Sequence, residues 1–442
     1  MTIQKCLLAL ALSSSLVHAQ DKAPKKEIII KATALKSGFK GMILQAVKSH
    51  PQIKKLQSAS QITFHDIDIA KGAFLPTFDI RSSNGYEHSS NATVVNDGDL
   101  HRTRFRRENS FIARQLLFDG GEASTRVERN KYLYSRANFG TLDGKEALAL
   151  RAVIAYLDVF RVREQLTLSV GNIKAHNEIL KIVEARLKHK IDRASDKVQV
   201  SGRLALAEAQ LRRDKADLNS AEARFIEVFG VKPGVAMAAA AAATGIPKEL
   251  QQAQNVTAVS HPALEALKET VKSIESSIKE VKSRYLPRIN LEVSGAFNED
   301  LGGNNSVEEA ASAMVVFSYN LYNGGRDASS ILKELTRKDQ EEYQLHETKR
   351  NLIRNVATAW YERDGKQAEI DFFRKHQIAS RETYKAYQQQ YELGQRSLFD
   401  LLNARSEYFR ASFSVVDAKY TIKSSEFRIL AAMGTLMEYL NK

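Results

Sequence analysis

The sequence of 442 residues contains 1 cysteine and 7 prolines, and each scarcity excludes a class of protein. A single cysteine cannot form an intrachain disulfide, which excludes a small disulfide-stabilised scaffold. So few prolines, together with only 22 glycines, indicate long regular elements rather than many short loops. No apolar run of about 18 residues follows the N-terminus, which excludes a bundle of membrane-spanning helices. A content of 43% hydrophobic and 26% charged residues excludes a disordered or collagen-like chain.

The N-terminus has the pattern of a secretory signal peptide. Met1–Lys5 is short and basic, Leu7–Leu12 is apolar, and Val17 and Ala19 stand at −3 and −1 of a cleavage site. We therefore expect residues 1–19 to be a signal peptide and residues 20–39 an N-terminal tail. Cys6 lies within the signal, before its apolar core, so we expect an exported mature protein without a thiol or lipid anchor.

The formal net charge of +13 does not point to nucleic acid. Lysine and arginine are mixed with aspartate and glutamate along the whole chain, and only short basic clusters such as His101–Arg107 stand out. No aromatic residues are interleaved at a spacing suited to base stacking. We expect a solvated surface and no nucleic-acid partner.

Motifs of catalysis and cofactor binding are missing from the sequence. It contains no His-Glu-x-x-His motif, no phosphate-binding Walker A loop and no Gly-x-Ser-x-Gly motif. The 10 histidines are dispersed, without the spacing of metal ligands. We predict that the protein is not an enzyme and carries neither a cofactor nor a metal.

Two halves of the chain repeat the same landmarks in the same order. A His-Pro pair, an aromatic-Leu-Pro triplet and a Gly-Gly pair occur once in each half, and the Gly-Gly pairs are 204 residues apart. The matching segments are His50-Pro51 and His261-Pro262, Phe74–Pro76 and Tyr285–Pro287, and Leu117–Gly121 and Leu321–Gly325. This indicates an internal duplication, with a first repeat at 40–235, a linker at 236–260 and a second repeat at 261–442.

Each half contains an alternating segment followed by a turn-rich stretch. Ile289, Leu291 and Val293 alternate with polar residues, and so do Phe74, Phe78 and Ile80 in the first half. Alternate side chains of a strand face opposite sides, so each segment predicts a strand with one apolar face. We expect strands near 74–118 and 285–322, with loops at Ser82–Asp99 and Asn298–Ser306. Return strands are expected near Phe105–Phe118 and Ala311–Tyr322, and each ends at a Gly-Gly pair: Gly120-Gly121 and Gly324-Gly325.

Long helices follow each pair of strands. Ala123–Lys188 would extend roughly 100 Å as one helix, with Gly140 and Gly144 as possible interruptions. The segments near 200–228 and 404–432 carry apolar and small residues at a seven-residue period, which indicates left-handed coiled-coil packing. The core positions are Val200, Leu204, Ala207, Leu211, Asp214, Leu218, Ala221, Phe225 and Val228, then Ala404, Tyr408, Ala411, Val415, Ala418, Ile422, Ser425, Ile429 and Ala432.

Four strands are too few to close a membrane barrel, because the smallest known single-chain barrels use about eight. An open sheet with one apolar face would leave unpaired edges, which lipid does not tolerate. Either several copies of the chain pool their strands, or the sheet covers its own helices. Export, alternation and helix length together favour a shared barrel with ring symmetry and a helical stalk.

With these features the sequence resembles the TolC-like outer-membrane channel proteins of Gram-negative bacteria. The paired landmarks carry the resemblance, together with Gly394–Asp400 and Ala432–Leu436. It covers residues from about 40 to 440. It implies a homotrimer with a shared 12-stranded outer-membrane β-barrel, four strands per chain, on a long periplasmic α-helical barrel. It also implies a mixed α/β belt built partly from the linker and the C-terminus.

In this family the two turns between long helices form a closed periplasmic entrance, here near Leu187–Arg193 and Leu393–Ser397. By the resemblance, Asp400 occupies the inward acidic position, Arg396 the position of the tip arginine, and Asp196 is the first-half counterpart of Asp400. Gly394 suits a turn, whereas the first turn is read as one residue longer, with His189 where glycine is common. Asn403 stands where some members carry a second acidic residue, so a double acidic ring does not follow. An alternative role for Asp400 is to cap a helix N-terminus.

The resemblance implies a passive duct in the outer membrane that extends into the periplasm and works with a periplasmic adaptor and an inner-membrane ABC or proton-driven transporter. We favour type I secretion of a protein substrate, with multidrug or small-molecule efflux as the alternative. A hypothesis of another class is a periplasmic coiled-coil scaffold without a pore.

Overall fold

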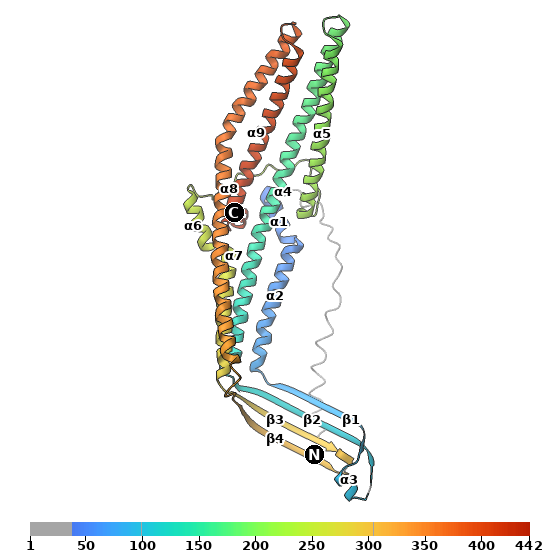
Figure 1. The fold of residues 1–442 in the computed structure, drawn as a ribbon, viewed down its shortest axis with the longest axis vertical. Helices are drawn as coiled ribbons and strands as arrows, with labels where there is room; N and C mark the ends of the chain where they lie inside the picture. The colour runs from blue at the N-terminus through green and yellow to red at the C-terminus, as the bar shows by residue number, and fades with distance from the viewer. Residues whose placement is uncertain (1–37, 99, 304) are drawn as a thin grey trace.

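The computed structural model describes residues 38–442, except residues 99 and 304. A long helical part carries a four-stranded sheet at one end, and the sheet lies at an angle to the helices (Figure 1). The expected signal peptide and most of the expected tail lie outside the described residues.

The elements of the first half are repeated in the second half. In both halves a 21-residue helix begins with proline after a capping histidine, and a 67-residue helix follows the second strand. The imidazoles of His50 and His261 accept hydrogen bonds from the amides of Gln52 and Ala263. The first half comprises α1 (Phe39–Ser49), α2 (Pro51–Lys71), η4 (Gly72–Phe74), β1 (Thr77–Ser89), α3 (Ala92–Asn96), β2 (Arg102–Phe118), α4 (Glu122–Lys188) and α5 (Ala194–Phe229). The second comprises α6 (Leu250–Ser260), α7 (Pro262–Lys282), η5 (Ser283–Tyr285), β3 (Arg288–Glu299), η6 (Leu301–Gly303), β4 (Val307–Ser318), α8 (Arg326–Glu392), α9 (Leu398–Ala432) and α10 (Leu436–Asn441).

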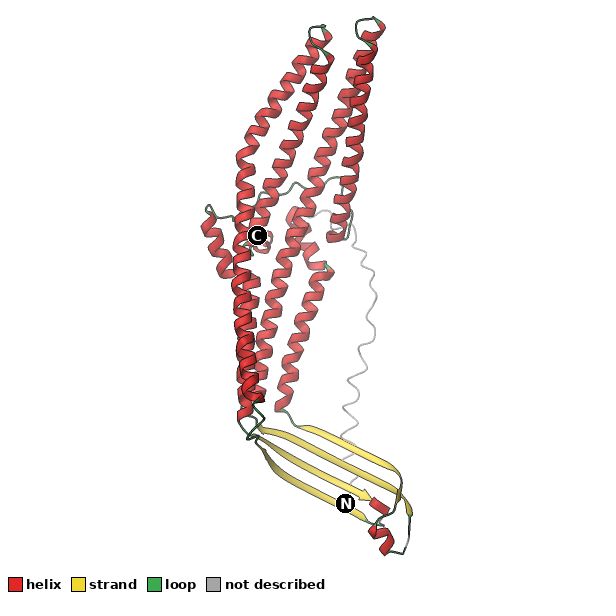
Figure 2. Cartoon of the chain, in the orientation of Figure 1, coloured by secondary structure: helices red, strands yellow, loops and turns green. Residues whose placement is uncertain are grey.

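The four strands form one antiparallel sheet in the order β1-β2-β3-β4 (Figure 2). The register places Ile80 opposite Phe111 and Leu291 opposite Val315, all on one apolar face. Asp79, Arg114 and Glu292 lie on the other face, where Arg114 is 3.6 Å from Asp79 and 3.3 Å from Glu292. The sheet therefore has one apolar and one polar face, and β1 and β4 have no strand partner on their outer sides within the described residues.

The strand boundaries differ from those expected from the sequence. β1 continues to Ser89, through the first part of the segment expected to be a loop, and α3 follows it. Phe74 lies in η4 rather than in the strand, and β4 runs from Val307 to Ser318, earlier than expected. The glycine, asparagine and serine residues of segment 82–89, which suggested a loop, are held by backbone pairing with Arg102–Asn109 of β2. This extension could not be predicted from composition, because the partner strand forms hydrogen bonds with the backbone N–H and C=O groups whatever the side chains are.

The helix α4 is continuous over 67 residues, about 100 Å at the usual rise per residue. Neither Gly140 nor Gly144 interrupts it. A Cβ at Gly144 would lie 2.3 Å from Cδ1 of Leu56, so this glycine lets α2 approach α4 closely. At Gly140 a Cβ would meet nothing within 4 Å.

The long helices form two hairpins, α4–α5 and α8–α9, which lie side by side with α4 next to α9 (Figure 1). Most of the small positions of the seven-residue repeat are buried, as the period predicts, among them Ala207, Ala221, Ala411 and Ala418. Asp214 of α5 is also buried, at the contact with α4 within the first hairpin, and it accepts a hydrogen bond from Ser169 of α4.

The segments around the middle of the helices differ from the mixed α/β belt that the resemblance implied. The described residues there form helices and irregular chain, and no strand lies outside the four-stranded sheet. The alanine-rich segment is held by side chains instead of a strand ladder: Tyr156 donates to the carbonyl of Ala238 and Tyr439 to that of Ala242. None of the described helices has an apolar stretch long enough to cross a bilayer.

Candidate functional site at the helical tip

The two helix–helix turns lie together at the end of the molecule opposite the sheet (Figure 1). They have equal lengths, because α4 ends at Lys188 and α5 begins at Ala194, while α8 ends at Glu392 and α9 begins at Leu398. The expectation of a longer first turn is therefore wrong. Lys190, with φ of 58°, holds the left-handed position that Gly394 holds in the second turn with φ of 77°. His189 is the counterpart of Leu393, and a lysine takes the place of the missing glycine.

Asp400 lies in the first turn of α9 next to Arg396. Nη1 of Arg396 is 3.7 Å from Oδ2 of Asp400, and Nε donates to Gln390 at 3.2 Å. Ser397 is the N-cap residue: its hydroxyl accepts from the amide of Asp400 at 3.1 Å and donates to the Asp400 carboxylate at 2.9 Å. The capping role thus belongs to Ser397, and the half-exposed Asp400 carboxylate keeps an accessible negative charge.

Asp196 occupies the same position on α5 as Asp400 does on α9, but its contacts differ. Oδ2 of Asp196 accepts from the backbone amide of Arg193 at 2.9 Å, so this carboxylate closes the N-terminus of its own helix. Asn403 lies one turn beyond Asp400, and its Oδ1 accepts from Arg203 of α5 at 3.4 Å. Asn403 therefore connects the two hairpins, whereas Asp196 stays within one.

A second connection between the hairpins involves residues that the sequence did not single out. Nε of Arg186 donates to both oxygens of Asp192, whose side chain is 8% exposed, at 3.1 and 3.2 Å. The hydroxyl of Tyr391, on the other hairpin, donates to Oδ2 of Asp192, and Nη1 of Arg186 donates to the carbonyl of Glu392 at 3.0 Å. We call Arg186, Asp192 and Tyr391 the tip cluster.

The electrostatics of the tip cluster keep Tyr391 protonated. Burial, followed by the neighbouring carboxylate of Asp192, raises the pKa of Tyr391 above its ordinary value. The phenol therefore remains a hydrogen-bond donor at neutral pH, and the Arg186 guanidinium lies 4.9 Å from its ring centroid. Asp192 could have been found from the sequence, because it lies 204 residues before Arg396 and is therefore the first-half counterpart of the tip arginine. Its contact with Tyr391 could not, because that contact depends on how the two hairpins pack.

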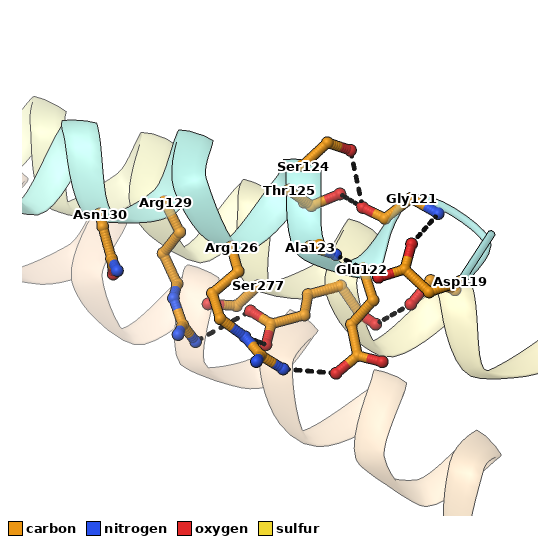
Figure 3. Close-up of polar contacts among 12 residues, drawn as sticks. Asp119, Gly121, Glu122, Ala123, Ser124, Thr125, Arg126, Arg129, Asn130 and Ser277 are labelled. Atoms are coloured by element: carbon orange, nitrogen blue, oxygen red, sulfur yellow. Dashed lines mark hydrogen bonds and ion pairs between the residues drawn. The ribbon is translucent and has the colours of Figure 1, made fainter. Parts of the chain in front are cut away.

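The paired glycines lie between β2 and α4 and between β4 and α8, as the sequence suggested, and all four have positive φ. At the first junction the carboxylate of Asp119 accepts from the amides of Gly121 and Ala123, at 3.0 and 2.7 Å (Figure 3). Arg126 bridges Glu122 of its own helix and Glu280 of α7. These contacts fix the angle at which the helix leaves the sheet.

The two junctions are not equally covered. A Cβ at Gly120 would lie 2.7 Å from Cβ of Leu286 and 2.8 Å from the carbonyl oxygen of Ser283, so this junction is packed against the second repeat. At Gly324 and Gly325 a Cβ would meet nothing within 4 Å, and the nearby Leu321 and Tyr322 are 87% and 83% exposed. The second junction therefore has an open surface at the place where the first has a partner.

The described residues contain no group of three histidine, cysteine or acidic side chains that could hold a metal ion. The tip is thus an arrangement of acidic, basic and aromatic side chains between two hairpins, and its contacts depend on how the hairpins are placed.

Comparison with known proteins assigns this architecture. A sequence model described as "Outer membrane efflux protein" matches residues 42–231 and 255–435. Outer membrane efflux protein BepC of Brucella suis biovar 1 is 24% identical, over 91% of this chain and 86% of its own length. Alkaline protease secretion protein AprF of Pseudomonas aeruginosa is 21% identical, over 84% of this chain and 79% of its own length.

Solved structures share the fold. CusC, a transmembrane channel, has a TM-score of 0.78 at 14% identity, covering 89% of this chain and 91% of its own. The open state of the Neisseria gonorrhoeae outer membrane channel MtrE has a TM-score of 0.75 at 15% identity, covering 90% and 89%. The match to the outer membrane efflux protein model, which describes channel proteins, overturns the hypothesis of a scaffold without a pore.

Proposed function

The chain belongs to the outer membrane efflux protein family of channel proteins, which are not enzymes, and on that premise we propose that it is a passive trimeric duct for type I secretion of a protein substrate. The duct spans the outer membrane through its strands and reaches into the periplasm through its helices. A periplasmic adaptor and an inner-membrane transporter complete the export system and supply the energy.

The observation that carries this proposal is the two-faced sheet with unpaired edges. Its apolar face exposes large side chains, among them Phe78, Ile80 and Phe317, at 75%, 72% and 64%. Its opposite face carries charged side chains that suit a water-filled lumen. An open edge is not tolerated in lipid, so β1 and β4 must find partner strands on other copies.

The internal duplication indicates how the copies join. Within one chain β2 of the first repeat pairs with β3 of the second. If β4 pairs in the same way with β1 of the next copy, three chains close a barrel of 12 strands. The uncovered junction at Gly324 supports this arrangement, because the next copy's Gly72–Leu75 would cover it as Ser283–Leu286 covers Gly120.

We place the periplasmic gate at the tip. In a trimer three Asp400 carboxylates would surround one axis, repel each other and attract cations. The tip cluster and Asn403 hold the α8–α9 hairpin to the α4–α5 hairpin, so opening requires these contacts to separate. The contact of Arg396 with Asp400 would stabilise the closed entrance.

Secretion is favoured over efflux by two relatives that match over most of their length. These are AprF and the proteases secretion protein PrtF of Dickeya chrysanthemi, which is 20% identical over 89% of this chain and 87% of its own length. Small-molecule efflux is the second candidate, supported by the name and coverage of BepC.

A deletion strain separates the two candidates. If the duct secretes a protein, deletion removes a polypeptide from the culture medium or cell surface, and complementation restores it. Increased drug sensitivity with an unchanged set of secreted proteins would instead establish efflux.

The gate is tested by single-channel recording of the purified protein in planar bilayers. Asp400→Ala is expected to lower the preference for cations over anions, because it removes negative charge from the constriction. Asp68→Ala on α2, far from the turns, is the matched control. An unchanged cation preference in Asp400→Ala would contradict the acidic ring.

A further inference from the structure

A buried arginine lies in the seam between the two hairpins, below the tip. Arg405 of α9 is only 7% exposed. Its Nε donates to Oδ1 of Asn172 at 3.1 Å and its Nη2 to the carbonyl of Gly171 at 3.2 Å, both on α4. Its guanidinium lies 5.2 Å from the ring centroid of Tyr384 on α8 and 5.5 Å from that of Tyr408 on α9.

Among the described residues, no carboxylate lies within ion-pair distance of Arg405. Its hydrogen-bond acceptors on α4 are a neutral amide and a backbone carbonyl, and the tyrosine rings contribute only weak attraction for the cation. By comparison, Lys419 in the same α4–α9 seam pairs with Glu164 at 2.8 Å. The charge of Arg405 is thus desolvated without an ion pair, and among the described residues the only carboxylate that attracts it, that of Glu178, lies beyond ion-pair distance and offsets the lost hydration only in part.

The surroundings of Arg405 add to this cost. His176, one turn from Asn172 on α4, is 3% exposed, and its Nδ1 has no hydrogen-bond partner. Burial, then the nearby charges of Arg405 and Arg203, lowers the pKa of His176 to about 4, so the imidazole is neutral at neutral pH. The seam therefore contains a buried cation beside an imidazole that cannot accept a second positive charge.

We propose that Arg405 is a positioning residue that biases the α4–α9 seam towards separation, so that the entrance can open when a partner engages the tip. In the closed arrangement the guanidinium is desolvated; when the hairpins separate it regains water. An apolar side chain of similar length has the opposite effect on the free energy of separation, because burial stabilises it and exposure to water destabilises it. This inference rests on the proposed gate and adds the residue whose desolvation lowers the free energy needed to separate the hairpins.

The proposal predicts opposite effects for the two partners of one hydrogen bond. Arg405→Met removes the buried charge and should stabilise the closed seam. Asn172→Leu leaves the charge buried with one acceptor fewer and should favour separation. The double variant Arg405→Met/Asn172→Leu, which has no buried charge, should return to the closed behaviour.

Two measurements on the full-length purified protein test this. Hydrogen exchange of peptides from α4 and α9 near the seam should be slower in Arg405→Met and faster in Asn172→Leu, with shifts of about tenfold, the usual size for one charge-assisted hydrogen bond. In planar bilayers the channel should open less often in Arg405→Met and more often in Asn172→Leu. Tyr391→Phe, which removes a contact of the tip cluster, is the control for opening.

The outcomes separate the inference from the proposed function. Faster exchange in Arg405→Met would overturn the inference, since Arg405 would then hold the seam closed, and unchanged exchange in both single variants would overturn it as well. If exchange changes as expected while Tyr391→Phe and the seam variants leave conductance unaltered, the seam behaves as inferred and the gate assignment is wrong.

Discussion

At the scale of single residues, the most telling groups are buried and charged. Glu146 of α4 is 6% exposed, and its two oxygens accept from the amides of Leu436 and Met437 at 3.0 and 3.1 Å. This carboxylate joins α10, near the C-terminus, to the longest helix of the first repeat. Burial raises the pKa of Glu146 to about 7, although the two amides oppose the shift.

The raised pKa of Glu146 predicts a pH dependence of stability. The folded state binds the proton more tightly than the unfolded state, so the stability from this group is fully present below about pH 4.5 and is lost as the pH rises towards 7. Glu146→Gln should remove this slope, and its amide oxygen keeps one of the two backbone hydrogen bonds. Thermal unfolding between pH 4 and pH 8 measures the slope, and parallel curves for the two proteins would contradict the prediction.

Lys190 is a second residue whose effect on stability can be measured, through the strain of its backbone conformation. A lysine with φ of 58° is in the left-handed region, which costs roughly 1 kcal/mol relative to glycine. Lys190→Gly should therefore stabilise the first tip turn, with a higher unfolding temperature and the same fold by circular dichroism. Gly394→Lys in the matching turn should have the reverse effect, and equal unfolding temperatures for all three proteins would be inconsistent with strain.

At the scale of elements, close packing depends on where side chains are missing. Gly144 and Gly140 lie one turn apart on α4, but only Gly144 faces α2, through Leu56. We expect Gly144→Val to destabilise the protein by about 1–3 kcal/mol more than Gly140→Val, because overpacking forces α2 away. Chemical denaturation of both variants tests this, and equal losses would show that helix propensity alone is responsible.

The elements also show which features could be predicted from the sequence. The proline landmarks, the alternation and the seven-residue period predicted the duplicated order of helices and strands, because these patterns reflect local geometry. The extension of β1 to Ser89 was missed, since pairing with β2 overrides a composition typical of loops. At the tip, the turns and Asp400 could be found by motif, whereas Tyr391 and Asp192 come from different hairpins and meet only through packing.

At the scale of the whole molecule, the open junction predicts an assembly contact. Gly324→Ala should lower the yield of heat-modifiable trimers, because the next copy's Gly72–Leu75 would have to approach that position. Gly245→Ala, with positive φ of 91° and nothing within 4 Å, is the control for backbone strain alone. Gel analysis of unheated outer-membrane fractions measures the trimer. If Gly324→Ala and Gly245→Ala give the same yield of trimer, the proposed contact is absent.

Periodicity, proline placement and duplicated motifs were sufficient to predict the class of elements and their order, because each of these depends on residues close in the chain. Only the tertiary structure decided which side chains meet between the hairpins, that Lys190 stands for glycine, and that one junction is covered while its twin is bare. The contacts between the hairpins and at the junctions join segments far apart in the chain, so their geometry is set by packing and leaves no local pattern, and the backbone conformation of Lys190 has no residue-type signal because a lysine holds it.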